Sequence, residues 1–246
     1  MTDTNRSLGI GVGLIALAIG VTIGGVAIAL GIRDIRRAGD EVTATGSARR
    51  PIVSDFVIWR GTVSGQHPSL PEAFRELQVR SDKVKRYLQA HAIPDSVITV
   101  RPLETYGIPE FTPEGRETGR NSSYRVSQTF EVRSADVERT SQLSADLSQL
   151  INDGVPISAQ PPEFLYTKLS EIRGQMLADA TRDARVRAEQ IAKSAGSELG
   201  RVRTVRVGVF QITPRYSTEV ADYGINDSSS RDKDITAVVR VTFALD

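Results

Sequence analysis

Two histidines and a set of carboxylates are the side chains that could supply acid–base chemistry or bind a metal ion. His67 and His91 each lie beside a predicted chain break, and no paired histidine–carboxylate spacing accompanies them. Asp179, Asp183 and Glu189 lie among arginines at helical spacing, which is typical of a solvated, salt-bridged helix face. The sequence therefore predicts neither a metal site nor a catalytic pair at these positions.

Other chemistry-bearing motifs are missing from the sequence. The chain contains no cysteine, which excludes disulfides, thiolate zinc sites, iron–sulfur clusters and cysteine nucleophiles. It contains no G-x-x-x-x-G-K phosphate loop and no G-x-S-x-G nucleophile elbow. We therefore expect no cofactor and a function other than catalysis. The alternative is an enzyme, which a cleft around an acid or base with a strongly shifted pKa would support.

Two polar segments that contain aromatic residues are candidate contact surfaces. The first runs from Tyr106 to Phe111, and the second runs from Tyr216 to Tyr223. Loops lie at the surface, and tyrosine-containing loops are enriched at interfaces. We predict that these four aromatic residues take part in contacts, with plain solvent exposure as the alternative.

Residues Leu8–Ile32 form a run of twenty-five residues without a charged side chain, between Arg6 and Arg33. An α-helix rises about 1.5 Å per residue and the hydrocarbon core of a bilayer is about 30 Å thick, so about twenty such residues suffice to span it. The sequence predicts a transmembrane helix over residues 8–32, preceded by a short tail at residues 1–7 and followed by a linker at residues 33–40.

Small residues recur along this run at spacings of three and four, which places them on one helical face. They are Gly9, Gly13, Ala16, Gly20, Gly24, Ala27 and Gly31. Lipid does not drive helices together, so spanning helices associate by close backbone contact along small residues. We predict that this face mediates homo-oligomerisation within the lipid bilayer, although membrane helices are also rich in glycine in general.

The ends of the run leave its processing and its orientation open. A cleaved signal peptide is the alternative to an anchor, because Ala27–Ala29 fits a small-x-small cleavage site, although its apolar region should be only about 7–15 residues long. Arg33, Arg36 and Arg37 follow the run, and the positive-inside rule then favours a cytoplasmic C-terminal part. That rule weakens when a long domain follows the span.

The remainder of the chain is balanced in charge. Removing the four basic and two acidic residues of positions 1–37 from the totals of 31 and 30 leaves 27 basic and 28 acidic residues. A nucleic-acid-binding protein should show a clear basic surplus, so we expect no nucleic-acid partner. About two hundred residues can bury a proper core, as one domain or as two packed halves.

Hydrophobic periodicity predicts an alternation of strands and helices in this remainder. The predicted strands cover about residues 42–47, 53–63, 96–108, 123–133, 155–166, 201–211 and 234–245. The segment 155–166 is predicted to be broken by Pro161–Pro162 and to lie at an edge or bulge. The predicted helices cover about residues 70–91, 134–152 and 168–195. The order ββαββαβαββ predicts an α+β fold, with a mostly antiparallel sheet packed by about three helices. Residues 213–233 are predicted to form a flexible loop.

Helix faces and one tryptophan predict where the core lies. The last helix has an unusually small apolar face, which would let it sit close to a sheet: Leu169, Ile172, Met176, Ala180, Ala184, Ala188 and Ile191. The first helix has a larger apolar face with a gap at Ser81: Leu70, Phe74, Leu77, Val84 and Leu88. Trp59 has apolar neighbours and is expected in the core, with an interface anchor as the alternative.

Several segments in order carry a family resemblance. Residues 42–48 open with V-x-A-x-G, and residues 151–155 read I-N-D-G-V before a strand that contains Phe164. Residues 184–192 form an alanine-rich helix with central arginines, and residues 195–202 contain A-G followed by L-G-R-V. This set resembles the SIMPL domain family, a domain of unknown function that includes a bacterial periplasmic immunogenic protein. The resemblance covers residues 41–246.

The resemblance implies an α+β domain that assembles into large ring- or cage-like homo-oligomers, usually outside the cytoplasmic membrane. It implies no catalytic residues, and it suggests associations with envelope or oxidative stress. We therefore expect a single-pass protein of the inner membrane that forms a scaffold of this kind in the cell envelope. The alternative is a tethered binding module for a small molecule or an unfolded envelope protein, which would need a pocket or an apolar groove.

Overall fold

The computed structural model describes residues 22, 25 and 40–246. All seven residues of the predicted small-residue face lie outside this part of the chain: Gly9, Gly13, Ala16, Gly20, Gly24, Ala27 and Gly31. The remainder of the predicted span, apart from the helical residues Thr22 and Gly25, also lies outside it. Among the described residues, no helix has the length and apolarity needed to cross a membrane.

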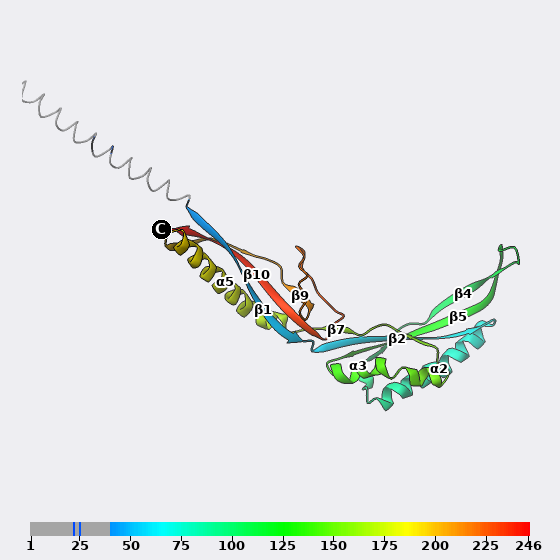
Figure 1. Cartoon of the computed structure of the whole chain (residues 1–246). Coiled ribbons are helices and arrows are strands. Elements are labelled where there is room, and N and C mark those ends of the chain that lie inside the picture. Colours follow the sequence, from blue (N-terminus) through cyan, green and yellow to red (C-terminus); the bar gives the residue numbers. More distant parts are fainter. Residues whose placement is uncertain (1–21, 23–24, 26–39) are drawn as a thin grey trace, which may run out of the picture. The chain divides into compact units, whose positions relative to one another are not determined.

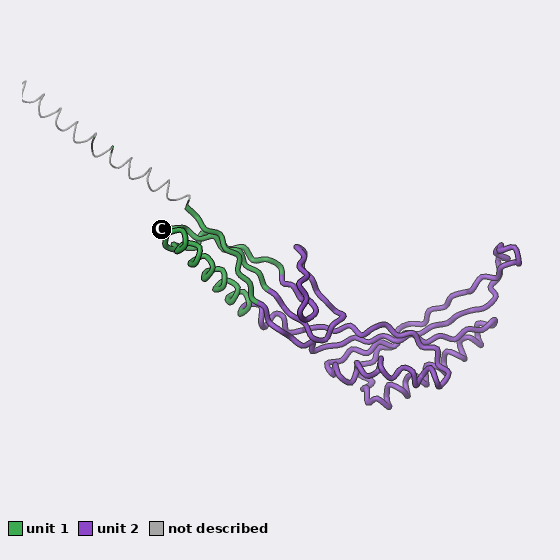
Figure 2. Tube along the Cα trace, viewed as in Figure 1, with its two compact units in different colours: residues 1–48, 175–209, 237–246 green, residues 49–174, 210–236 purple. Residues whose placement is uncertain are grey.

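The chain divides into two compact units (Figure 2). The first consists of residues up to 48, residues 175–209 and residues 237–246, and the second consists of residues 49–174 and 210–236. Each unit contains a long helix and antiparallel strands, so the predicted α+β fold is confirmed. Three elements continue from one unit into the other: β1 (Glu41–Val53), α5 (Leu169–Ser194) and β10 (Asp232–Leu245).

In the first unit the strand order is β1-β10-β8, where β8 covers Leu199–Val207. β8 and β10 are antiparallel, from Val207 opposite Val239 to Leu199 opposite Leu245. The helix α5 runs along β1 and β10 (Figure 1). The strands therefore form a small sheet whose last member, β8, pairs with β10 and with no further strand among the described residues.

The predicted small face of α5 is confirmed over four turns. Its buried residues repeat every four positions: Met176, Ala180, Ala184, Ala188 and Ala192. A Cβ added to Gly46 of β1 would lie 2.1 Å from the carbonyl oxygen of Ala180, so α5 and β1 are in backbone contact at this point. Ile191, which was predicted on this face, is half exposed and Ala192 is buried instead, because so close an approach leaves no room for a branched side chain.

The second unit holds a six-stranded sheet in which β3-β5-β2-β6 form the main path, β4 pairs with β5 and β7 pairs with β2. Its strands are β2 (Phe56–His67), β3 (Ile98–Val100), β4 (Glu104–Phe111), β5 (Glu117–Ser134), β6 (Ile157–Ala159) and β7 (Glu163–Leu165). Its helices are α2 (Leu70–Ala90), η1 (Asp95–Val97), α3 (Val137–Ala145) and α4 (Ser148–Asn152). β9 (Gln211–Pro214) pairs with residues 233–236 of β10 in the same unit.

Large side chains fill the core of the second unit. Trp59 and Phe130 are fully buried with leucines of α2 and α3, which confirms the core position predicted for Trp59. A Cβ on Gly65 of β2 would lie 2.3 Å from the carbonyl oxygen of Ala73, so α2 also touches a strand backbone. Phe74, expected to be buried, is more than one-third exposed. Ser81, the gap in the predicted face, is buried and donates a 3.3 Å hydrogen bond to Gln128.

Two predicted elements were wrong in their continuity. The helix expected over residues 134–152 is divided into α3 and α4 at Asp146. There the Gln149 N–H donates to the Asp146 carbonyl oxygen at 3.0 Å, a hydrogen bond between residues three apart in place of the four of an α-helix. The strand expected over residues 96–108 is η1, β3 and β4. It is interrupted after Val100. The Arg101 N–H still donates to the Thr129 carbonyl of β5 at 2.8 Å, but Pro102 has no N–H to continue this ladder.

Candidate interaction surfaces

A two-stranded arm carries the first predicted aromatic pair. Before Tyr124, β5 pairs with β4 and with no other strand of residues 40–246, so the end of this hairpin stands as a two-stranded ribbon (Figure 1). Tyr106 is 65% exposed and Phe111 is 56% exposed on β4. Isolated two-stranded ribbons are at best marginally stable in water, so exposed aromatic residues on one are candidates for contact with another molecule.

The second predicted aromatic pair lies on the segment between β9 and β10. Tyr216 is 82% exposed and Tyr223 is 89% exposed. Tyr216 has a φ of +66°, a left-handed conformation that a bulky residue rarely adopts. Its N–H donates to Asp234 Oδ2 at 3.3 Å, and Arg215 lies 5.5 Å from the centre of its ring. The backbone at Tyr216 is therefore held in a specific, outward-facing conformation.

Buried polar side chains hold the remainder of this segment. The side chain of Gln211 donates to the Ala221 carbonyl at 2.6 Å and accepts from the Ile225 N–H at 2.8 Å. Lys233 Nζ is buried and donates to the carbonyl of Phe164 at 2.6 Å and to the carbonyl of Asp227. Burial lowers the pKa of Lys233, and Asp227 opposes that effect. The predicted flexible loop is thus tied to β7 and β9 at defined points.

The structure does not bring the two aromatic pairs together. Both belong to the second unit, but β9, from which the second segment continues, lies well apart from the β4–β5 arm (Figure 1). The four predicted residues therefore form two separate exposed surfaces, each with two exposed aromatic rings.

A third surface, the open edge of β8, was not predicted from the sequence. Val202, Val205 and Val207 lie opposite Phe243, Val241 and Val239 of β10, which are buried. Antiparallel partners share a face of the sheet, so the three valines lie on the face that α5 covers. They are nevertheless about half exposed, so α5 leaves a large part of each of these side chains uncovered. The alternation of valine with arginine was the available signal, and it predicted the strand without indicating that the strand lies at an edge.

Glu131 is the centre of a charge cluster on the second sheet and was also missed. Its side chain is buried and accepts from Arg60 at 2.8 Å, from Arg101 at 2.6 Å and from Arg133 at 2.5 Å. The hydrogen bond from Arg101, followed by those from Arg60 and Arg133, lowers the pKa of Glu131 to about 2 against the effect of burial. Arg60 also pairs with Glu163 of β7 at 2.5 Å. The cluster therefore joins β2, β5 and β7, and a charged residue between Phe130 and Val132 was the only sequence signal for it.

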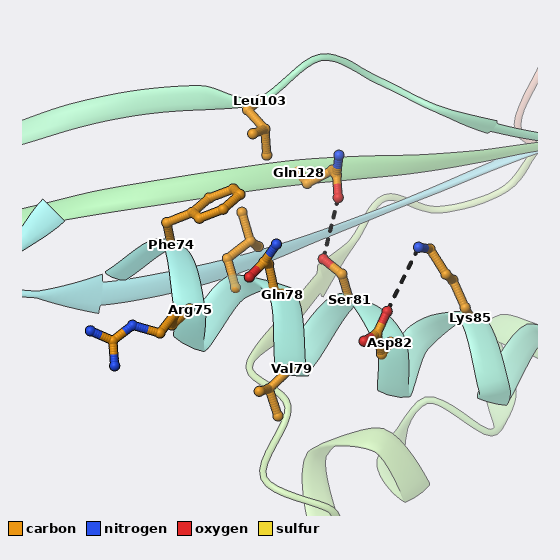
Figure 3. A pocket seen from close by; sticks show the side chains of 10 residues that line it. Phe74, Arg75, Gln78, Val79, Ser81, Asp82, Lys85, Leu103 and Gln128 are labelled. Carbon is orange, nitrogen blue, oxygen red and sulfur yellow. Dashed lines mark hydrogen bonds and ion pairs between the residues drawn. The ribbon is translucent and has the colours of Figure 1, made fainter. Parts of the chain in front are cut away.

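A groove of about 560 Å³ lies beside α2 (Figure 3). Phe74, Val79 and Leu103 supply its apolar surface and are all partly exposed. Ser81 and Gln128 face one another across it, and the amide of Gln128 also donates to the Arg101 carbonyl at 3.4 Å. The groove can therefore accept an apolar ligand that carries a hydrogen-bonding group.

The histidines and the helix carboxylates take structural positions. His67 Nδ1 accepts from the Ser69 N–H at 3.0 Å, and His91 lies 3.4 Å from Asp146. Asp183 accepts from the Ser47 N–H at 2.8 Å, which lowers its pKa, and it pairs with Arg187 at 2.9 Å. The predicted salt-bridged helix face is confirmed. Among the described residues, no three His, Cys, Asp or Glu side chains are placed to hold a metal ion.

Comparison with known proteins identifies a family and a relative that each match most of the chain. The profile of the SIMPL family, described as "Protein of unknown function (DUF541)", matches residues 42–243. An uncharacterized protein YggE of Edwardsiella ictaluri (strain 93-146) is 24% identical over 210 residues, which cover 84% of each chain. The matched region includes residues of both compact units.

Two solved structures show distant similarity to this chain. A putative aminohydrolase from methicillin-resistant Staphylococcus aureus has 13% identity and a TM-score of 0.23, over 57% of this chain and 39% of that chain. A hydrolase from Listeria innocua has 10% identity and a TM-score of 0.22, over 80% of this chain and 91% of that chain. Values this low carry no argument about fold or activity.

Proposed function

Because the chain belongs to the SIMPL family, a family of unknown function, we propose that it is a membrane-anchored, non-enzymatic protein that assembles into a ring- or cage-like homo-oligomer in the cell envelope. Residues 8–32 would anchor each copy, and the small-residue face would bring the anchors together in the bilayer. The soluble part would lie outside the cytoplasmic membrane and would serve as a scaffold, in a role connected with envelope or oxidative stress.

The β4–β5 arm is the observation that carries this proposal. It exposes Tyr106 and Phe111 on a ribbon with no third strand among the described residues. Aromatic side chains bury a large area on association, and a neighbouring molecule would shield the ribbon from water. A second copy of the chain is the partner that is present wherever the protein is made.

The mass of the full-length protein in mild detergent tests the proposal, measured beside a variant that begins at Asp40. Large particles from both proteins would assign assembly to the soluble part, with the anchor as a tether. Large particles from the full-length protein alone would assign assembly to the small-residue face of residues 8–32. Monomers from both would contradict the scaffold.

The contribution of the arm is tested by replacing Tyr106 and Phe111 together with serine. We expect smaller particles from this variant and unchanged folding, since both side chains are exposed. Val186→Ser is the matched control, because Val186 is a half-exposed apolar residue on α5 in the other unit. Particles of unchanged mass in the serine variant would show that the arm has no role in assembly.

The groove beside α2 supports the second candidate function, a tethered binding module. Its apolar surface and the paired Ser81 and Gln128 are the combination that holds an apolar ligand in a fixed orientation. An environment-sensitive hydrophobic dye should bind the wild type, and Leu103→Ser should bind it several-fold more weakly while Val186→Ser does not. Equal dye binding by all three proteins would contradict this function.

A further inference from the structure

The open edge of β8 is basic as well as apolar. Arg201, Arg203 and Arg206 lie on this strand, and it contains no acidic residue. Arg203 pairs with Glu41 at 3.4 Å, whereas Arg201 and Arg206 have no acidic partner among residues 40–246. The outer backbone edge of the strand is likewise unpaired within the described residues. An edge with free hydrogen-bonding groups and half-exposed apolar side chains is suited to accept another segment.

The segment of residues 216–223 has the opposite character. It contains Glu219 and Asp222 and no basic residue. Neither carboxylate has a basic partner in the described part of the chain. Beside these carboxylates, Val220 is 77% exposed, in addition to the exposed rings of Tyr216 and Tyr223. Residues 217–221 have no regular secondary structure. The Ser217 N–H donates to the Pro214 carbonyl at 3.0 Å and the Ala221 carbonyl accepts from Gln211, so the segment would meet a strand edge mainly through its exposed side chains.

We infer that residues 216–223 of one copy dock against the open edge of β8 in a second copy. Glu219 and Asp222 would meet the arginines of β8, while Val220 and Tyr223 would cover Val205 and Val207. The contact rests on the homo-oligomer proposed above and names a surface for it. Because it joins two different patches, it is a head-to-tail contact, the type that closes into a ring when the rotation between subunits permits.

The charges favour residues 216–223 over a second β8 strand as the segment that docks on the open edge. Two β8 strands side by side would bring six arginines together without a carboxylate, and like charges on adjacent strands are destabilising. The acidic segment instead supplies opposite charges together with apolar area. Both surfaces belong to the same chain and are therefore present in equal numbers.

Cross-linking between single-cysteine variants tests the contact, since the chain has no cysteine of its own. Full-length Val205→Cys and Tyr223→Cys proteins, carrying different tags, are made in the same cell, extracted in mild detergent and oxidised. We expect a mixed dimer joined by a disulfide between positions 205 and 223. The matched control pairs Val205→Cys with Val186→Cys, a half-exposed apolar position on α5, and should give about tenfold less mixed dimer.

A charge exchange provides the second measurement. Arg206→Glu and Glu219→Arg should each reduce the mixed dimer by about tenfold, because each places like charges in contact. Mixing the two variants should restore the yield at the interface where the exchanged charges meet. Failure to restore it, after both single changes have reduced it, would contradict direct charge contact.

The remaining outcomes separate this inference from the proposed function. Large particles that give no 205–223 disulfide would overturn the inference and leave the homo-oligomer intact, whereas monomers would overturn both. A dominant 205–205 disulfide would assign the edge to a second β8 strand instead. Binding of the protein to vesicles of anionic lipid that is lost in Arg206→Glu, with particle mass unchanged, would assign the edge to a lipid surface and overturn the inference.

Discussion

In both units a long helix crosses the strands over a glycine, Gly46 beneath α5 in the first unit and Gly65 beneath α2 in the second. The side chains around the two glycines differ completely. Around Gly46 the helix presents a column of alanines, whereas around Gly65 it presents leucines that pack with Trp59 and Phe130. The same close approach of helix and strand can therefore be supported by methyl groups alone or by a core of large side chains.

The sheets of the two units also differ in their buried charges and in the pairing of their strands. The second unit places a buried carboxylate among three arginines on its sheet, and several short strands flank the long ones. The first unit leaves β8 paired on one side only within the described residues. Within the described residues, the second unit therefore buries its central carboxylate among charges of its own, whereas the first leaves one edge of β8 unpaired.

The largest expected effect comes from filling either glycine site. Gly46→Ala or Gly65→Ala would place a Cβ within 2.3 Å of helix backbone atoms, so we expect each to lower the free energy of unfolding by more than about 4 kcal/mol. Gly174→Ala is the matched control. It lies in α5 with nothing within 4 Å of the added Cβ and should stabilise the protein by about 0.5–1 kcal/mol. Denaturation followed by circular dichroism measures all three, and a mild effect at Gly46 would break the comparison.

The side chains in the two cores differ in size, so we expect the cores to respond in opposite ways to a change in side-chain volume. Leu88→Ala should cost about 3 kcal/mol through a cavity in the second unit, and Ala184→Leu should cost about as much by forcing α5 away from β1. Leu88→Met should cost less than about 1.5 kcal/mol, because it conserves volume. Urea denaturation of the three variants would test the contrast, which fails if Ala184→Leu is tolerated.

The buried carboxylate predicts a pH dependence. The folded pKa of Glu131, about 2, lies below its ordinary value of 4.5, so its contribution to stability is complete above about pH 4.5 and is lost as the pH falls towards 2. Glu131→Gln leaves three arginines without their carboxylate and should cost about 3 kcal/mol at neutral pH. Its stability should also vary less than that of the wild type between pH 4.5 and 2. Equal pH profiles in that window, measured by thermal denaturation, would show that the cluster does not stabilise the fold.

The smallest effect on folding is expected at the β8 edge. Val205→Ser with Val207→Ser removes half-exposed apolar area, so we expect the free energy of unfolding to change by no more than about 0.5 kcal/mol. Particle mass in mild detergent should fall in this variant. A large loss of stability in the Asp40-start protein would show instead that the valines belong to a core.

The spacing of apolar residues within a single helix or strand predicted which of its faces is buried. The alanines that recur at every fourth position predicted a helix that lies close to strands. The apolar neighbours of Trp59 predicted that this residue lies in the core. The predicted helix end at residue 152 is confirmed, because α4 ends at Asn152 and Gly154 follows with a left-handed φ of +75°. Continuity failed where a single residue changed the backbone bonding, at Asp146 and at Pro102.

The candidate surfaces were only half predictable. Composition identified Tyr106, Phe111, Tyr216 and Tyr223, because aromatic residues in polar segments stand out in a sequence. It could not identify the environment of Glu131, whose partners come from residues 60, 101 and 133. Only Arg133 follows from local geometry, since residues two apart share one face of a strand.

The sequence by itself determined the α+β class, the antiparallel strands and the faces that α2 and α5 bury over most of their length, because periods of 2.0 and 3.6 residues are local properties. The tertiary structure decided which strand lies at an edge, which valines α5 leaves uncovered and which arginines meet Glu131. These depend on strand order, and strand order is set by the sum of contacts between residues far apart in the chain. An alternating strand such as β8 therefore has the same sequence pattern whether a helix covers its valines or leaves them exposed.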